Sequence, residues 1–133
     1  MKVSISRPVL DQILAHAAEH PDAEVCGLLL GDAGEIIAAC PAANVAPDRS
    51  RRFEIDPAVL FEAHRAARDG GPSILGHYHS HPNGNASPSA ADAEEAQPGQ
   101  LWLIVAGTEA VMFGTCRTGP IHGRFQPVDI DLR

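Results

Sequence analysis

Three histidines alternate near the middle of the chain, in the stretch GHYHSHPNGNASPSAAD at residues 76–92. Successive side chains of a β-strand point to opposite faces, so His79 and His81 share a face and can reach the same ion. The loop 82–88 is rich in Pro, Gly and Asn, which favour turns, and it can return the chain so that Asp92 joins them. Two imidazoles and one carboxylate are three protein ligands, which leaves the fourth tetrahedral position of a zinc ion open, as in catalytic sites.

Other interpretations of these residues stay open. A His-x-His pair alone is a weak signal, and Ser89 with Asp92 three residues later fits a capping box at the start of a helix. His77 shares the face of His79 and His81, so a ligand set that includes His77 is a rival. His77 can instead be an outer partner that fixes the tautomer of a bound imidazole. A cap alone does not account for the two upstream histidines and the proline, which favours the metal site.

The combined pattern resembles the signature of the JAMM (MPN+) metalloprotease family. Residues 79–82 read HSHP, ten residues separate His81 from Asp92, and Ser89 stands three residues before Asp92. The family's pattern also has an upstream glutamate followed by a Cys-Gly-Leu run, which the segment EVCGLLLG at residues 24–31 matches. The resemblance extends from the first predicted helix to the strand predicted at residues 101–106.

This resemblance implies both a fold and a set of roles. The implied fold is α/β, a single-domain mixed β-sheet flanked by helices over residues 1–133, of the MPN/JAMM type and similar to the cytidine deaminases. The implied cofactor is Zn²⁺, held by His79, His81 and Asp92, where it would lower the pKa of a water towards about 7 and polarise the scissile carbonyl. Glu24 is the implied general base, and Ser89 the implied hydrogen-bond donor to the oxyanion.

The resemblance also implies a class of substrate. Small stand-alone relatives of this type trim ubiquitin-like sulfur-carrier proteins, so the implied activity is cleavage of a peptide or isopeptide bond after the carrier's C-terminal Gly-Gly. The loops around the site are short, so we do not expect linkage-specific cleavage of polyubiquitin. One alternative is a non-catalytic MPN scaffold, against which the complete set of site residues argues. Another is a zinc hydrolase of a different substrate, such as a deaminase, but the chain has neither His-x-Glu nor Pro-Cys-x-x-Cys.

The composition limits the partners and the compartment. The chain has 133 residues and a formal charge of -7, which argues against nucleic acid or an anionic membrane as a partner. Its cysteines, Cys26, Cys40 and Cys116, are odd in number and contain no Cys-x-x-Cys, so they predict neither a disulfide framework nor a structural zinc cluster. No apolar run is long enough for a signal peptide or a membrane span. We therefore expect a cytoplasmic protein.

Apolar periodicity and turn residues predict the elements that position the site. Pro8 and Pro57 each open a helix, Asp56 caps the second helix, and Gly70 ends it. The segment that Glu24 begins is apolar nearly throughout, as buried strands are. Strands are predicted at 1–6, 24–31, 35–40, 52–55, 73–79, 101–106, 109–117 and 121–128, and helices at 8–20, 57–68 and 89–96.

Several other residues are predicted to have structural or surface positions and no part in the reaction. The basic cluster of Arg49, Arg51 and Arg52 is expected to be solvated, with substrate docking as the alternative. His16 and His20 are expected to be surface or capping residues. The remaining predictions concern Cys26 and Cys40 as core thiols, His64 as structural or exposed, His122 as an edge residue, and Asn44 as a residue with no assigned role.

Overall fold

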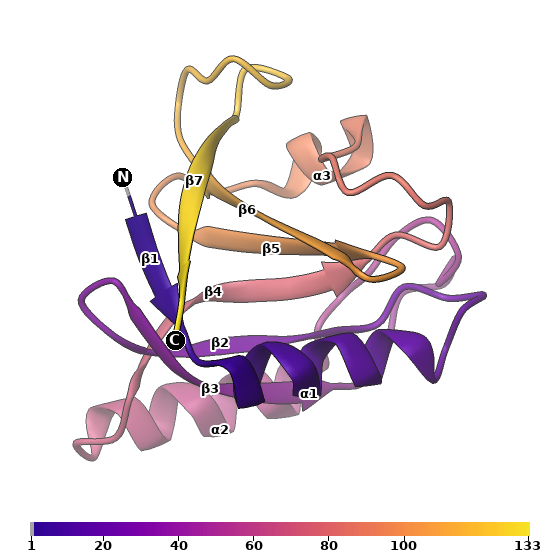
Figure 1. The fold of residues 1–133 in the computed structure, drawn as a ribbon. Helices are drawn as coiled ribbons and strands as arrows, with labels where there is room; N and C mark the ends of the chain where they lie inside the picture. The colour runs from indigo at the N-terminus through magenta and orange to yellow at the C-terminus, as the bar shows by residue number, and fades with distance from the viewer. Residues whose placement is uncertain (1) are drawn as a thin grey trace.

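The computed structural model describes residues 2–133 (Figure 1). In this range the chain forms seven strands and three helices: β1 (Lys2–Ile5), α1 (Arg7–Ala18), β2 (Cys26–Asp32), β3 (Glu35–Ala42), α2 (Pro57–Arg68), β4 (Ser73–Ser80), α3 (Ala90–Glu95), β5 (Leu101–Ala106), β6 (Glu109–Thr115) and β7 (Phe125–Leu132). All three predicted helices are present, and α2 has the predicted bounds. Its N-cap Asp56 accepts a hydrogen bond from the amide of Ala58 at 3.0 Å, as the sequence predicts.

The strands form one mixed sheet in the order β1-β3-β2-β4-β5-β6-β7. The pairs β1–β3, β1–β7 and β4–β5 are parallel, and the other neighbours are antiparallel. The mixed sheet confirms the predicted fold class. Because β1 pairs with both β3 and β7, the sheet also closes into a barrel, which the local sequence pattern does not predict.

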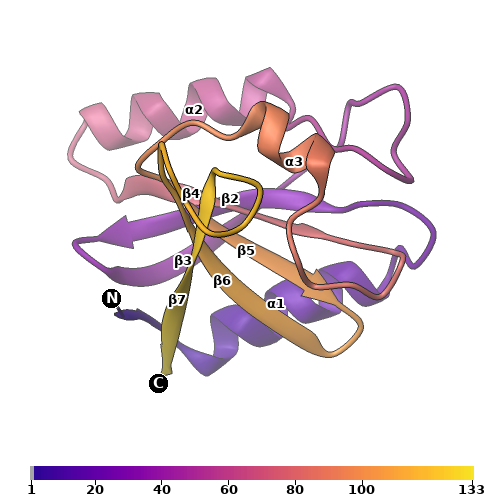
Figure 2. The same ribbon diagram turned by 90° about the horizontal axis from the view of Figure 1, so that it is seen from above.

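Helices cover the sheet from two sides. Figure 1 and Figure 2 show α1 and α2 on opposite sides of β2, β3 and β4, with α3 on the side of α2. The buried side of α1 carries Val9 and Ile13, which join Leu29, Tyr78 and other residues in one apolar core. A second core, on the side of α2 and α3, contains Trp102, Ile104, Phe113 and Phe125. The flanking helices confirm the predicted layering.

Three predicted strands need correction. The strand predicted at 24–31 begins at Cys26, so Glu24 precedes the regular ladder. The strand predicted at 52–55 is reduced to an isolated bridge between Asn44 and Ile55, because this segment belongs to a wide loop. The strand predicted at 121–128 runs instead from Phe125 to Leu132.

The shift of the last strand has a tertiary cause. Residues 129–132 pair with β1, a partner more than 120 positions earlier in the sequence, which a local pattern cannot reveal. Pro127 lies inside β7, where it is paired with Phe113 of β6. A proline inside a strand weakens the local signal because it lacks an amide hydrogen.

The structure also changes the predictions for His16 and Cys40. His16 is half-buried, and its Nδ1 lies 2.7 Å from the hydroxyl of buried Tyr78, so it is a packing residue of α1 rather than a surface or capping residue. Cys26 is fully buried, as expected of a core thiol, whereas Cys40 is only half-buried. No helix of residues 2–133 has the length and apolar character needed to cross a membrane.

Candidate metal centre

The end of β4 and the start of β2 deliver the central residues of the site. The ladder between these strands pairs Cys26 with His79. Beyond it, the amide of Ser80 donates to the carbonyl of Val25 at 3.0 Å, and the Ser80 hydroxyl accepts from the amide of Val25 at 2.9 Å. These two hydrogen bonds extend the pairing past the end of the strands and bring Glu24 next to His81.

Four of the five predicted site residues converge in a buried place. The Nε2 atoms of His79 and His81 lie 3.1 Å apart, and Asp92 Oδ2 lies 3.1 Å from His81 Nε2 and 3.4 Å from His79 Nε2. Glu24, His79 and His81 each offer an atom within 4.8 Å of the other two. Each of the four residues is at most 6% exposed.

These distances fit a tetrahedral ion. Ligand atoms that surround zinc at 2.0–2.1 Å are separated from one another by about 3.3 Å, which is the spacing of the two imidazole nitrogens and the carboxylate oxygen here. Without an ion, three lone-pair-bearing atoms would face one another in a buried place, where at most a shared proton can relieve their repulsion. The donor set therefore suits Zn²⁺.

The backbone fixes the tautomer of His81. Its Nδ1 lies 2.7 Å from the carbonyl oxygen of Asn85, so this nitrogen carries the hydrogen and donates. Nε2 then presents its lone pair to the site, which is the arrangement that metal-bound imidazoles need. Burial lowers the pKa of His81, but the hydrogen bonds with Asp92 and Asn85 outweigh burial and raise it overall.

His79 is held by packing. Its ring is fully buried and stacks on Phe53, with ring centroids 4.3 Å apart and an interplanar angle of 18°. Its Nδ1 has no hydrogen-bond partner among residues 2–133. Burial lowers the pKa of His79, which keeps its Nε2 free to bind a cation.

Asp92 is both a helix cap and part of the site. The amide of Ser89 donates to Asp92 Oδ2 at 2.9 Å, and the amide of Asp92 donates to the Ser89 hydroxyl at 3.0 Å, so the predicted capping box is present. Burial alone would raise the pKa of Asp92, but the hydrogen bonds with His79, His81 and Ser89 hold it well below its usual range. The two interpretations of this pair are therefore compatible, because the cap aims an ionised carboxylate at the imidazoles.

Glu24 is buried, yet its Oε1 has no hydrogen-bond partner among the described residues. Burial raises the pKa of Glu24 to about 7, against a smaller opposing effect of His81. Asp92 lies within hydrogen-bond distance of both imidazoles, whereas Glu24 Oε1 has no such contact among the described residues. Such a carboxylate can take up and release a proton near neutral pH.

A cleft opens beside these residues, and Ser89, the fifth predicted site residue, lies on its wall. Glu24, His81 and Ser89 line it together with Arg51 and Pro82. Ser89 is half-buried, and although its oxygen accepts from the amide of Asp92, its hydroxyl hydrogen remains available to donate. The roles of the individual site residues stay predictions.

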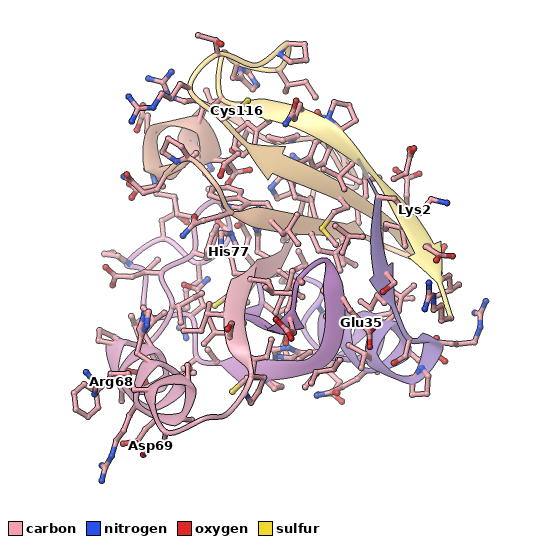
Figure 3. The ribbon with its side chains drawn as sticks, turned by 90° about the vertical axis from the view of Figure 1, so that its left-hand side faces the viewer. Lys2, Glu35, Arg68, Asp69, His77 and Cys116 are labelled. Carbon is pink, nitrogen blue, oxygen red and sulfur yellow. The ribbon has the colours of Figure 1, made fainter. Side chains whose placement is uncertain are left out.

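His77 lies next to this cluster, with its ring centroid 5.6 Å from that of His79. It sits on the face of β4 that α2 and α3 cover (Figure 3), where its ring packs on Trp102 with centroids 4.3 Å apart. It is buried, and its Nε2 has no partner among residues 2–133. The group of possible ligands found in this range combines His79 and His81 with Glu24 and includes neither His77 nor Asp92. The short distances that join Asp92 to His79 and His81 favour the ligand set with Asp92 over the rival set with His77.

The basic cluster is dispersed around the site. Arg51 borders the cleft, and Arg52 lies 3.9 Å from Glu94 in an exposed ion pair. The backbone carbonyl of Arg49 accepts from the amide of Glu24 at 2.6 Å.

Sequence reasoning missed three residues that shape the site, Asn44, Phe53 and Ser80. Phe53 is an aromatic residue in an otherwise polar loop, which is a weak signal. Ser80 belongs to the HSHP pattern, but that pattern assigns it no role, and Asn44 gives no signal in the local pattern.

Comparison with known proteins identifies the family of this chain. Residues 6–118 match the family model Prok-JAB, the prokaryotic homologs of the JAB domain. The chain is 40% identical over 110 residues to the desampylase of Haloferax volcanii, and the alignment covers 77% of this chain and 79% of that protein. It is 34% identical over 107 residues to the "Probable TtuB-protein conjugate cleaving protease" of Thermus thermophilus, and this alignment covers 80% of this chain and 71% of that protein.

Solved structures agree with these matches. A solution structure of a Desulfitobacterium hafniense protein superposes with a TM-score of 0.82 at 26% identity and covers 100% of this chain and 93% of that one. The crystal structure of a JAB1/MPN domain protein from Archaeoglobus fulgidus shares the fold, with a TM-score of 0.61 at 18% identity and 98% of each chain covered. The predicted resemblance is confirmed. This chain belongs to the prokaryotic JAB family.

Proposed function

We propose that this chain is a Zn²⁺-dependent metallopeptidase that hydrolyses a peptide or isopeptide bond after the C-terminal Gly-Gly of a ubiquitin-like protein of the sulfur-carrier type. The observation that carries the proposal is the convergence of Glu24, His79, His81 and Asp92 beside an open cleft. The relatives support the reaction class, because one is named a desampylase and the other a conjugate cleaving protease.

His79, His81 and Asp92 are the residues that would hold Zn²⁺. The bound ion supplies Lewis acidity to the scissile carbonyl and to a water molecule. The chain's own contribution is to hold the three ligand atoms ready at 3.1 to 3.4 Å from one another. His81 needs no rearrangement, because Asn85 already fixes its tautomer.

Glu24 is the proposed general base. In hydrolysis the water oxygen bonds to the carbonyl carbon, the C–N bond breaks, and one water proton ends on the leaving nitrogen. Glu24 Oε1 has no competing hydrogen bond among residues 2–133, so it is free to accept that proton and to deliver it to the amine. The Ser89 hydroxyl, on the wall of the same cleft, is the proposed donor to the carbonyl oxygen as negative charge develops on it.

An extended peptide tail finds a backbone edge next to the site. In the segment 52–54, the carbonyl of Arg52 and the amide and carbonyl of Glu54 are bonded to Asn44 and Val45. The amide and carbonyl of Phe53 have no partner among the described residues. They belong to a segment that lines a hollow with Asp92 on its other wall. A Gly-Gly tail can pair with this edge as an added strand, because glycine leaves room for close backbone approach.

The proposal is tested by intact-mass analysis of ubiquitin-like carriers that end in Gly-Gly plus a short extension. The zinc-loaded protein should release the extension after the second glycine, and the Glu24→Gln variant should not, although it binds zinc. Glu35→Gln is the matched control, since Glu35 is an exposed glutamate at the start of β3. If the protein binds one zinc per chain and cleaves none of the carriers, the substrate assignment is wrong. Equal cleavage by Glu24→Gln would refute the role of Glu24.

A further inference from the structure

The loop between β3 and α2 is closed on itself around Asn44. The amide of Val45 donates to the carbonyl of Glu54 at 2.9 Å, and the amide of Asp56 donates to the carbonyl of Ala43 at 3.1 Å. Asn44 also forms an isolated bridge with Ile55. The loop therefore returns to its starting point, with the Asn44 side chain inside the closure.

The side-chain amide of Asn44 makes four hydrogen bonds. Its Nδ2 donates to the carbonyls of Glu24 at 2.9 Å and Arg52 at 3.0 Å. Its Oδ1 accepts from the amides of Ala46 and Glu54, both at 3.0 Å. Two donors and two acceptor sites are the full capacity of a carboxamide, and the opposite flip would place like groups against each other. All four bonds depend on one side chain.

The first of these bonds reaches the proposed base. Asn44 binds the carbonyl of Glu24, and the amide of Glu24 donates to the carbonyl of Arg49 in the same loop at 2.6 Å. Glu24 precedes the first residue of β2, so no regular strand pairing holds its own backbone. Its backbone is instead attached to the loop 44–55.

The other bonds of the Asn44 side chain act on His79, a proposed metal ligand, through Phe53. Asn44 binds the carbonyl of Arg52 and the amide of Glu54, the two neighbours of Phe53. The ring of Phe53 stacks on His79 at 4.3 Å. The same carboxamide therefore holds the backbone of Glu24 on one side and the backbone that carries Phe53 on the other.

We propose that Asn44 is a positioning residue for the hydrolytic reaction: it fixes the Glu24 carboxylate relative to the His79 imidazole by tying the backbone of Glu24 to the backbone on both sides of Phe53. Asn44 is not among the residues that line the cleft with Glu24, His81 and Ser89, and in this proposal it does not act on the substrate. The claim about rate rests on the proposed function, whereas the claim about position does not. A residue that merely closes a loop would change stability and leave turnover unchanged.

Two substitutions separate the contributions of Asn44. Asn44→Asp has nearly the same shape and keeps an oxygen that can accept from Ala46 and Glu54, but it cannot donate to the carbonyls of Glu24 and Arg52. Asn44→Ala removes all four bonds. Gln12→Glu is the matched control, because Gln12 on α1 is an exposed carboxamide that donates to a single distant carbonyl, that of Ala39.

Amide hydrogen exchange tests the position in the zinc-free and the zinc-loaded protein. In Asn44→Asp we expect the amides of Ala46 and Glu54 to stay protected while the amide of Glu24 loses protection. In Asn44→Ala all three should exchange faster, and Gln12→Glu should match the wild type at these positions. If the amide of Glu24 keeps its protection in both Asn44 variants, the positional claim is wrong. If Asn44→Ala does not fold, Asn44→Asp alone decides the question.

Turnover tests the consequence. A displacement of about 1 Å at a reacting group can cost about 100-fold in rate, so kcat should fall about 10- to 100-fold in Asn44→Asp. KM should change less than about twofold, and the bound zinc should stay at one per chain. Unchanged kcat together with a lost Glu24 protection would overturn the role in the reaction. If even the wild type cleaves no carrier, the proposed function fails, and the exchange pattern still decides whether Asn44 positions Glu24.

Discussion

The buried carboxylate of Glu24 should make the zinc-free protein less stable as the pH rises, and Glu24→Gln should abolish this effect. Burial raises the pKa of Glu24 in the folded state from its ordinary value of 4.5 to about 7. Below pH 4.5 both the folded and the unfolded state hold the proton. Between pH 4.5 and 7 the unfolded state loses it first, so the free energy of unfolding falls as the pH rises. Above pH 7 the folded protein carries the buried charge in full.

The size of the effect follows from the two pKa values. Each pH unit between them is worth about 1.4 kcal/mol, so the ionised carboxylate costs the folded state up to about 3 kcal/mol at pH 8. Glutamine has nearly the same shape and no charge. We therefore expect Glu24→Gln to be more stable than the wild type by about 1 to 3 kcal/mol at pH 8, and this gain should vanish near pH 4.

Urea unfolding in the presence of a chelator measures this difference at pH 4, 6 and 8. The control Glu35→Gln should stay within about 0.5 kcal/mol of the wild type, as exposed substitutions usually do. A Glu24→Gln variant that is no more stable at pH 8 than at pH 4, relative to the wild type, would refute the assignment of Glu24 as a buried, unpaired carboxylate.

Three further predictions concern the metal, the aromatic cover and the sheet. Asp92→Asn keeps the shape of the helix cap but weakens an anionic ligand, so zinc affinity measured by competition with a chelator should fall by more than about 100-fold, beyond the effect of losing an outer partner. Phe53→Ala uncovers the ring of His79 and should weaken zinc binding by about 10-fold, whereas Phe53→Leu should restore most of it; unchanged affinity in Phe53→Ala would contradict the stacking argument. Gly76→Ala places a methyl group against the backbone carbonyl of Leu101 in the neighbouring strand, so thermal unfolding should show a loss of about 2 kcal/mol or more, and a wild-type midpoint would contradict the close approach of the strands.

The features that the sequence predicts correctly depend on residues that lie within a few positions of one another. Asp56 and Pro57 mark the start of α2 because capping and the fixed backbone angle of proline act within one turn. The pair of His79 and His81 is visible because strand alternation is also local. Ser89 and Asp92 are visible for the same reason, and their capping box is what turns the carboxylate towards the histidines.

Contacts between distant segments escape such an analysis. The bond from Asn44 to the carbonyl of Glu24 spans 20 positions, and Phe53 meets His79 across 26 positions. No periodicity connects these pairs, because their meeting depends on how the loop 44–55 folds over the ends of β2 and β4. The closure of the barrel by β1 and β7 escapes prediction for the same reason.

The unsatisfied polar atoms of the protein are concentrated on one face and at one strand end. Within residues 2–133, the buried side-chain atoms without a hydrogen-bond partner are Glu24 Oε1, His77 Nε2 and His79 Nδ1. Each such atom destabilises a folded protein by about 1 to 3 kcal/mol, and natural proteins mostly avoid them. Their concentration beside the facing nitrogens of His79 and His81 shows where the sequence departs from the rules that favour stability. In the proposed function, a cation held by His79, His81 and Asp92 would relieve the repulsion of the atoms that face one another, and a water molecule would give Glu24 Oε1 its partner. The cost of these buried polar atoms is what we expect of a site that is arranged before its ligands arrive.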